Sequence, residues 1–260
     1  MSMARRILAL MVLGLLGPGV AAAATLSIAV TVRQVGAPGV KVTAPDHQSG
    51  NPYQVLTYVF TVQNLGPKPD RFILSAQSSE HFPIRFPEGR DTDLLGPGQV
   101  GAVKIQLLIA GNAAAGVQDR LTATATSDKD HTISDQTSVI TIVNQVARVV
   151  VSRPAGQRGG RGHTLTYLLT IRNRGNGTDR FRLTASSSRG WVVLLPDGAL
   201  TVPLTGGSGP GSRTTMRIMV TIPPSETLGV QDILTLTVTS EFNPEVSGRA
   251  SVTSRVRGRR

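Results

Sequence analysis

Large apolar residues alternate with polar residues along most of this 260-residue chain. The clearest run has apolar side chains at every second position: Leu56, Tyr58, Phe60 and Val62. A period of two residues is typical of a β-strand with one buried face, whereas an amphipathic helix has a period near 3.6 residues. We find no segment with the helical period, so the pattern predicts an all-β protein.

The chain contains the same module twice. Residues 58–79, YVFTVQNLGPKPDRFILSAQSS, return at 167–188 as YLLTIRNRGNGTDRFRLTASSS, with eleven of the twenty-two residues identical. The segments GPG at 96–98 and GVQD at 116–119 return at 209–211 and 229–232. A unit of roughly 110 residues is large enough to bury a core of its own, so we expect two domains.

Alternating segments separated by turn residues predict about seven short strands in each module. Three strand pairs frame the prediction: an opening strand at 26–32 and 149–151, a middle strand near Ile84 and at 191–195, and a closing strand at 139–143 and 250–256. Seven such strands in a unit of this size predict an immunoglobulin-like β-sandwich. We therefore expect two tandem immunoglobulin-like sandwiches, at residues 25–146 and 147–260.

The first 24 residues have the composition of a signal peptide. Arg5 and Arg6 precede a short apolar run, and small residues at 21–24 suit cleavage. The apolar run is too short for a typical permanent membrane span, although an uncleaved anchor stays an alternative. We expect an exported protein, in the periplasm or on the cell surface. The chain has no cysteine, so burial and not disulfide bonding must stabilise it.

Several repeated residues suit turns between strands. Asn64 and Gly66, like Asn173 and Gly175, stand where a strand is expected to end. Asparagine and glycine both tolerate the left-handed backbone of a tight turn, so we expect that conformation here.

Two other features allow a structural or a ligand-binding interpretation. Asp70 and Asp179 follow these turns, where a carboxylate can bond backbone amides, pair with the adjacent arginine, or contact a ligand. Trp191, the only tryptophan, falls in a predicted strand, which favours core packing over stacking on a sugar. We expect the structural role for all three residues.

The second copy carries a recognisable series of short motifs. They are Asn-x-Gly at a strand end, Asp-x-Phe-x-Leu, Gly-Trp, Pro-Gly before a Thr-rich strand, and Pro followed by Gly-Val-x-Asp. The residues are Asn173, Gly175, Asp179, Phe181, Leu183, Gly190, Trp191, Pro210, Gly211, Pro223, Gly229 and Asp232. This series resembles bacterial extracytoplasmic immunoglobulin-like modules, the alpha-galactosidase-associated domain and the conserved-repeat domains of surface proteins. The first copy differs, with His81 and Phe82 in place of Gly-Trp. The resemblance implies a module that accompanies enzymes or builds cell-surface assemblies, and it implies no particular ligand.

Residues that could carry catalysis or hold a metal are few. The histidines are His47, His81, His131 and His163. They show no metal-binding spacing such as HExxH, and the chain has no GxSxG elbow, no SxxK motif and no phosphate loop before a helix. Asp91 with Asp93 and Asp128 with Asp130 have a spacing found in calcium loops, but the other ligands of such a site are lacking. We expect no enzyme activity, no metal and no cofactor.

Charge divides the two copies. Residues 25–146 contain nine basic and ten acidic residues, a net charge of −1, whereas residues 147–260 contain sixteen and six, a net charge of +10. All sixteen basic residues of the second copy are arginine, and all four lysines lie in the first. Because a duplicated fold needs no change of charge, this difference concerns the surface.

The arginines of the second copy form three clusters along the sequence. They are Arg153, Arg158 and Arg161; Arg172, Arg174, Arg180 and Arg182; and Arg255, Arg257, Arg259 and Arg260. The planar arginine fork binds phosphate and carboxylate groups, so these residues are candidate contacts for an anionic envelope polymer, lipid or protein. The alternative is a solvated surface with an arginine-rich composition. Nucleic acid is a less favoured partner, because an exported chain with few aromatic residues lacks the usual stacking platform.

Two functions remain open from the sequence. The first is a non-enzymatic envelope protein, a spacer or adhesion module that docks through its basic second domain. The second is an accessory protein that binds carbohydrate or an exported partner, including addition of a strand at an exposed sheet edge, as a periplasmic chaperone does.

Overall fold

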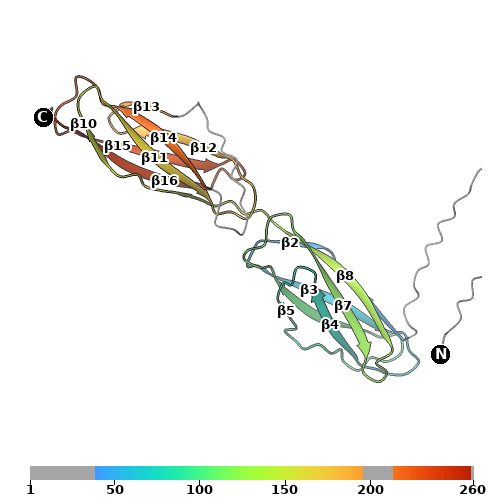
Figure 1. Cartoon of the computed structure of the whole chain (residues 1–260). Helices are drawn as coiled ribbons and strands as arrows, with labels where there is room; N and C mark the ends of the chain where they lie inside the picture. The colour runs from blue at the N-terminus through green and yellow to red at the C-terminus, as the bar shows by residue number, and fades with distance from the viewer. Residues whose placement is uncertain (1–38, 196–212, 259–260) are drawn as a thin grey trace, which may run out of the picture. The chain divides into compact units, whose positions relative to one another are not determined.

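The computed structural model describes residues 39–195 and 213–258, whose strands form two β-sandwiches (Figure 1). The predicted alternation is present: in β3 (Val55–Asn64), Leu56, Tyr58, Phe60 and Val62 are buried and the residues between them are not. The all-β prediction is confirmed. Over the described ranges, no helix has the length and apolar character needed to cross a membrane.

The first sandwich consists of two four-stranded sheets. One sheet has the order β1 (Val40–Thr43), β3, β6 (Val100–Leu108) and β5 (Ile84–Arg85). The other has the order β2 (Gln48–Gly50), β8 (Ser134–Val143), β7 (Gln118–Ser127) and β4 (Phe72–Ser78). All neighbours are antiparallel except β2 and β8, which are parallel.

The second sandwich repeats this topology. One sheet has the order β9 (Val149–Val151), β11 (Thr164–Asn173), β14 (Arg213–Thr221) and β13 (Val192–Leu194). The other has the order β10 (Gln157–Gly159), β16 (Ser247–Val256), β15 (Gln231–Ser240) and β12 (Phe181–Ser187). Here too the one parallel pair of described strands, β10 with β16, occupies a sheet edge.

The number of strands differs from the prediction, because eight and not seven are described in each sandwich. The additional strands are β2 and β10, whose three residues are too few to show an alternating pattern. The opening strand expected at 26–32 lies outside the described residues. The strand that pairs with β3 as β9 pairs with β11 is instead β1, at Val40–Thr43.

Each sandwich has its own hydrophobic core between its two sheets. Phe72 in the first and Phe181 in the second are both 1% exposed, and burial of each contributes about 1.5–3 kcal/mol. A buried hydrogen bond also joins the sheets of each sandwich: the hydroxyls of Tyr58 and Thr141 are 2.7 Å apart in the first. A domain boundary after residue 146 stays a prediction.

The repeated Asn-x-Gly turns do not use the predicted left-handed backbone. Neither Asn64 nor Gly66 has a positive φ, and the same holds for Asn173 and Gly175. The asparagine is instead buried, and Asn64 Oδ1 accepts a hydrogen bond of 2.8 Å from the Gly66 amide. Glycine is needed for close approach: a Cβ on Gly175 would lie 2.4 Å from the carbonyl oxygen of Val146.

Candidate functional site

The repeated aspartate of the GVQD motif has a structural role. Asp232 is fully buried, and its Oδ1 accepts hydrogen bonds from Ser187 Oγ (2.8 Å), Ser188 Oγ (2.9 Å) and the Arg189 amide (3.0 Å). These bonds fasten the start of β15 to the turn that follows β12. In the first sandwich Asp119 binds the matching residues in the same way, as listed by its donors Ser78, Ser79 and Glu80. The Oδ2 atoms of both aspartates are buried without a partner among the described residues.

Asp179 and Trp191 also have the structural roles expected for them. Asp179 Oδ2 accepts a hydrogen bond from Ser240 Oγ (2.6 Å), and its Oδ1 accepts one from the Phe242 amide (3.2 Å). Trp191 is 3% exposed, so its ring packs in the core, and its Nε1 donates to Glu226 Oε2 (2.8 Å).

Glu226 collects several donors in one loop. Arg189 forms an ion pair with it, with Nε 3.2 Å from Oε2. Hydrogen bonds from Arg189, from the Trp191 indole and from the Thr227 amide lower the pKa of Glu226 to about 2. Arg189 therefore has a carboxylate partner within the sandwich.

The candidate metal ligands remain dispersed. Within the described ranges, histidine, aspartate and glutamate form no group of three or more that could hold a metal ion. His47 has a structural contact, because its Nδ1 accepts a hydrogen bond of 2.9 Å from the Ile140 amide. In the loop before β8, hydrogen bonds from Thr132 lower the pKa of Asp130.

The acidic residues of the second sandwich lie away from its outer sheet surfaces. Asp179 and Asp232 are buried, Glu226 binds Arg189, and Glu241 and Glu245 lie in the turn between β15 and β16. The outward positions of the eight described strands, β9 to β16, therefore hold no acidic residue. Arginines occupy several of them: Arg172, Arg213 and Arg217 on one sheet, and Arg158, Arg182, Arg249 and Arg255 on the other.

Strand pairing regroups the three sequence clusters. Arg172 and Arg174 lie with Arg213, whereas Arg180 and Arg182 belong to the β12 end of the opposite sheet. Arg158 is the direct neighbour of Arg255, because β10 pairs with β16. Arg158 is thus in a strand and not in the expected glycine-rich loop.

The other predicted contacts have simpler surroundings. Arg153 and Arg257 are exposed outside the strands, and Arg161 Nε donates to the backbone carbonyl of Glu226. Arg259 and Arg260 lie outside the described residues.

One group of arginines surrounds a cleft. A cavity of about 370 Å³ on the outer face of the β9–β11–β14–β13 sheet is lined by Val150, Ser152, Thr170, Arg172, Arg174 and Arg213. Arg172 lies directly across from Arg213 on β14 and from Val150 on β9. Sequence clustering missed Arg213, Ser152 and Thr170, since they are far from one another along the chain. Comparison of the two copies offered a signal: Gln63 and Val100 occupy the positions of Arg172 and Arg213 in the first sandwich.

The same sheet face carries exposed apolar side chains. Leu168, Val192, Leu194 and Met219 all point outward, and Leu168 is 57% exposed. Leu194 lies directly beside Met219. Exposed apolar side chains that gather on one face mark an interaction surface.

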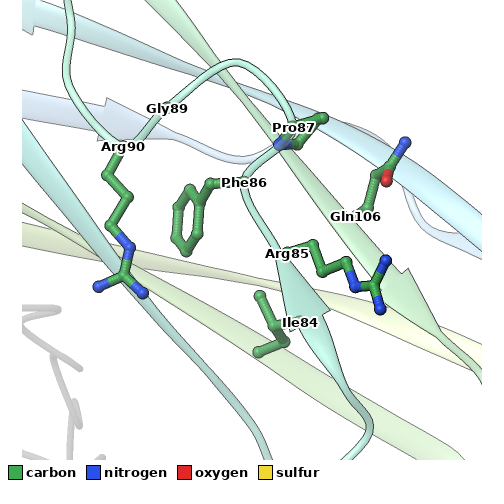
Figure 2. A pocket seen from close by; sticks show the side chains of 7 residues that line it. All are labelled: Ile84, Arg85, Phe86, Pro87, Gly89, Arg90 and Gln106. Atoms are coloured by element: carbon green, nitrogen blue, oxygen red, sulfur yellow. The ribbon is translucent and has the colours of Figure 1, made fainter.

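A second cavity lies in the first sandwich, at the end of β5. Figure 2 shows its seven lining residues, and its volume is about 580 Å³. Arg85 is the cross-strand partner of Gln106, and the Arg90 guanidinium lies 5.0 Å from the centre of the Phe86 ring. Lys104 on the adjacent β6 forms an ion pair of 2.6 Å with Glu88.

No protein-family model matches the chain, and no curated protein matches it. Among solved structures, the C-terminal domain of the AgI/II polypeptide BspA from Streptococcus agalactiae is 11% identical, with a TM-score of 0.31 over 84% of this chain and 100% of that one. The YadV chaperone is 9% identical, with a TM-score of 0.28 over 82% of this chain and 99% of that one. A Salmonella alpha-2-macroglobulin mutant is 14% identical, with a TM-score of 0.30, and this chain covers 16% of its length. Similarity of this degree supports no conclusion about function, and the family resemblance of the motifs stays a prediction.

Proposed function

We propose that this protein is a non-enzymatic, exported envelope protein, a tandem β-sandwich spacer or adhesion module that docks to an anionic partner through its second sandwich. One observation carries the proposal: the outward strand positions of the second sandwich hold seven arginines and no acidic residue among the described strands. A surface of one sign attracts partners of the opposite sign and raises their rate of association.

Two further features support docking to a large partner. The arginines lie on rigid strands, so few side chains must be ordered by a partner beyond their own rotamers. Exposed apolar residues such as Leu168 and Met219 share the face with Arg217. Such a mixture suits a macromolecular surface more than a small soluble anion.

The proposal can be tested with the full chain on a dextran sulfate matrix and on anionic cell-envelope preparations. One variant replaces the seven outward arginines of the second sandwich by glutamine. A matched variant removes seven charges from the first sandwich by substituting Lys41, Lys68, Arg71, Arg85, Arg90, Arg120 and Lys129. We expect the parent and the matched variant to be retained and to elute with salt, since screening weakens exposed charge pairs. The second-sandwich variant should elute at much lower salt.

Equal elution of the two variants would contradict docking through the second sandwich. Circular dichroism of both variants checks that they remain folded, which is expected because the substituted side chains point outward.

The alternative, an accessory protein that binds a partner by strand addition, has its own supporting observation. Over the described residues, β5 pairs with only Gln106 and Leu107 of the nine-residue β6. An extended peptide can pair with the remaining edge, and it would pass the cavity of Figure 2. Slower hydrogen exchange of the Ala102 and Lys104 amides in the presence of envelope extract would favour this function over docking by charge.

A further inference from the structure

Three guanidinium groups share the cleft formed by Arg172, Arg174 and Arg213. Arg172 and Arg213 are direct cross-strand partners, and like charges at such positions, with Cβ atoms about 4.5–5.5 Å apart, destabilise a sheet. None of the three forms an ion pair with a carboxylate of the described residues. An anion between the guanidinium groups converts this repulsion into attraction.

The wall of the cleft adds hydroxyl groups to the arginines. Ser152 Oγ accepts a hydrogen bond of 2.8 Å from the Thr170 amide, which leaves the hydroxyl hydrogen of Ser152 to donate elsewhere. The Thr170 hydroxyl lies 3.2 Å from that of Thr215 on the adjacent strand. The residues that line the cleft include no carboxylate, so the lining selects against cations.

The number and direction of the donors indicate which anion fits. Arginine forks at three positions, on β11, after β11 and on β14, reach a bound group from different directions. A phosphate group presents three or more acceptor oxygens and takes bidentate bonds from arginine, whereas a carboxylate presents two oxygens in one plane. The volume of about 370 Å³ accommodates a phosphate together with the first atoms of the group it esterifies.

The first sandwich provides an internal comparison for this cleft. Its matching hydroxyl residues are Thr43 and Thr61, which are paired like Ser152 and Thr170. At the arginine positions it has Leu65, Gln63 and Val100, so the hydroxyls are kept and all three guanidinium groups are absent. The fold therefore does not require the arginines.

We infer that this cleft binds the phosphate group of a phosphate ester. The inference rests on the docking function proposed above and names the anion that the second sandwich recognises. Two sources supply this chemistry outside the cell, a phospholipid headgroup and a soluble or polymeric sugar phosphate, and both place a phosphate on the three arginines.

The test uses the full chain in a phosphate-free buffer, with thermal unfolding followed at constant ionic strength. The probes are inorganic phosphate, glycerol 3-phosphate and, for comparison, acetate. We expect the two phosphates to raise the unfolding temperature of the second sandwich and acetate to have little effect. The variant R172Q/R213V, which introduces the residues of the first sandwich, should bind glycerol 3-phosphate at least about tenfold more weakly, since charge-assisted hydrogen bonds are lost.

Two further variants separate the cleft from general charge. R182Q/R249Q removes the same charge from the opposite sheet and should bind glycerol 3-phosphate like the parent chain. R172K/R213K keeps the charge but loses the planar fork, and it should bind with intermediate affinity. R172Q/R213V should be at least as stable as the parent without ligand, because it removes a like-charge pair.

Vesicles distinguish the two sources of phosphate. Binding to phosphatidylglycerol vesicles that is lost in R172Q/R213V and absent with phosphatidylcholine assigns the site to a lipid headgroup. Binding of glycerol 3-phosphate without vesicle binding assigns it to a sugar phosphate.

Three results would overturn the phosphate site: an equal effect of acetate, unchanged phosphate binding by R172Q/R213V, or equal losses in R182Q/R249Q. If phosphate binding fails while the parent chain is still retained on envelope preparations, only this inference is wrong. If phosphate binds but the chain is not retained, the proposed docking function is wrong and the site stands.

Discussion

Two matched turns allow the strain of one backbone angle to be measured. The turn after β4 holds His81 at a φ of 58°, and the matching turn after β12 holds Gly190 at a φ of 69°. A left-handed backbone costs a residue with a Cβ about 1–2 kcal/mol. Tyr53 and Gly162, with φ of 68° and 73°, repeat this contrast in another pair of turns.

The expected size of the effect follows from the surroundings of Gly190. A Cβ placed there meets no heavy atom within 4 Å beyond its chain neighbours, so G190A introduces backbone strain without a clash. Alanine also lowers the entropy of the unfolded chain, which returns about 0.4–1 kcal/mol. We therefore expect G190A to destabilise the second sandwich by about 0.5–1 kcal/mol, and H81G to stabilise the first by a similar amount.

Urea unfolding can report each change separately. Trp191 is the only tryptophan and is buried beside Gly190, so its fluorescence follows the second sandwich, while far-UV circular dichroism follows both. The midpoint should fall for G190A and rise for H81G, with unchanged slopes. A higher midpoint for G190A together with a lower one for H81G would refute the assignment of strain to this angle.

Other predictions concern buried and loop polar groups of the second sandwich. D232A leaves three hydrogen-bond donors unpaired and should lower the free energy of unfolding by about 3–5 kcal/mol, measured by urea titration; a loss under 1 kcal/mol would contradict the clamp. Y167F leaves the buried Ser254 hydroxyl, now 2.7 Å from its partner, without that partner, and should cost about 1–3 kcal/mol, most of it restored by the added change S254A. Because the pKa of Glu226 falls from 4.5 to about 2 on folding, its contribution to stability is complete above pH 4.5 and is lost as the pH falls toward 2. The parent chain should therefore lose its advantage over E226Q across that range, and a constant difference in urea midpoint from pH 2 to 6 would contradict this.

The repeated polar residues illustrate what a local pattern can and cannot predict. The sequence places Asp232 in a turn motif, but its donors follow β12, more than forty residues earlier. The Tyr167 hydroxyl likewise meets Ser254 across the sandwich. Side-chain alternation predicts that Tyr167 is buried, whereas its partner depends on how the two sheets face each other.

The candidate site shows the same limit. Arg172 and Arg174 were predicted as anion contacts from their spacing, and Arg213 was missed because 41 residues separate it from Arg172. The register of β11 with β14 makes Arg172 and Arg213 neighbours, and the alternation of side chains sends Arg182 to the opposite sheet. Proximity along the sequence is therefore a poor guide to which charges act together on a sandwich.

The sequence by itself determined the all-β class, the duplication, the buried faces of the long strands and the excess of arginine in the second copy. These properties are local, since the period of two and the composition are read from neighbouring residues. The tertiary structure decided which strands pair, and so which arginines share a cleft and which aspartates clamp a turn. Those outcomes depend on the register between strands far apart in the chain, where a shift of one residue sends each side chain to the other face.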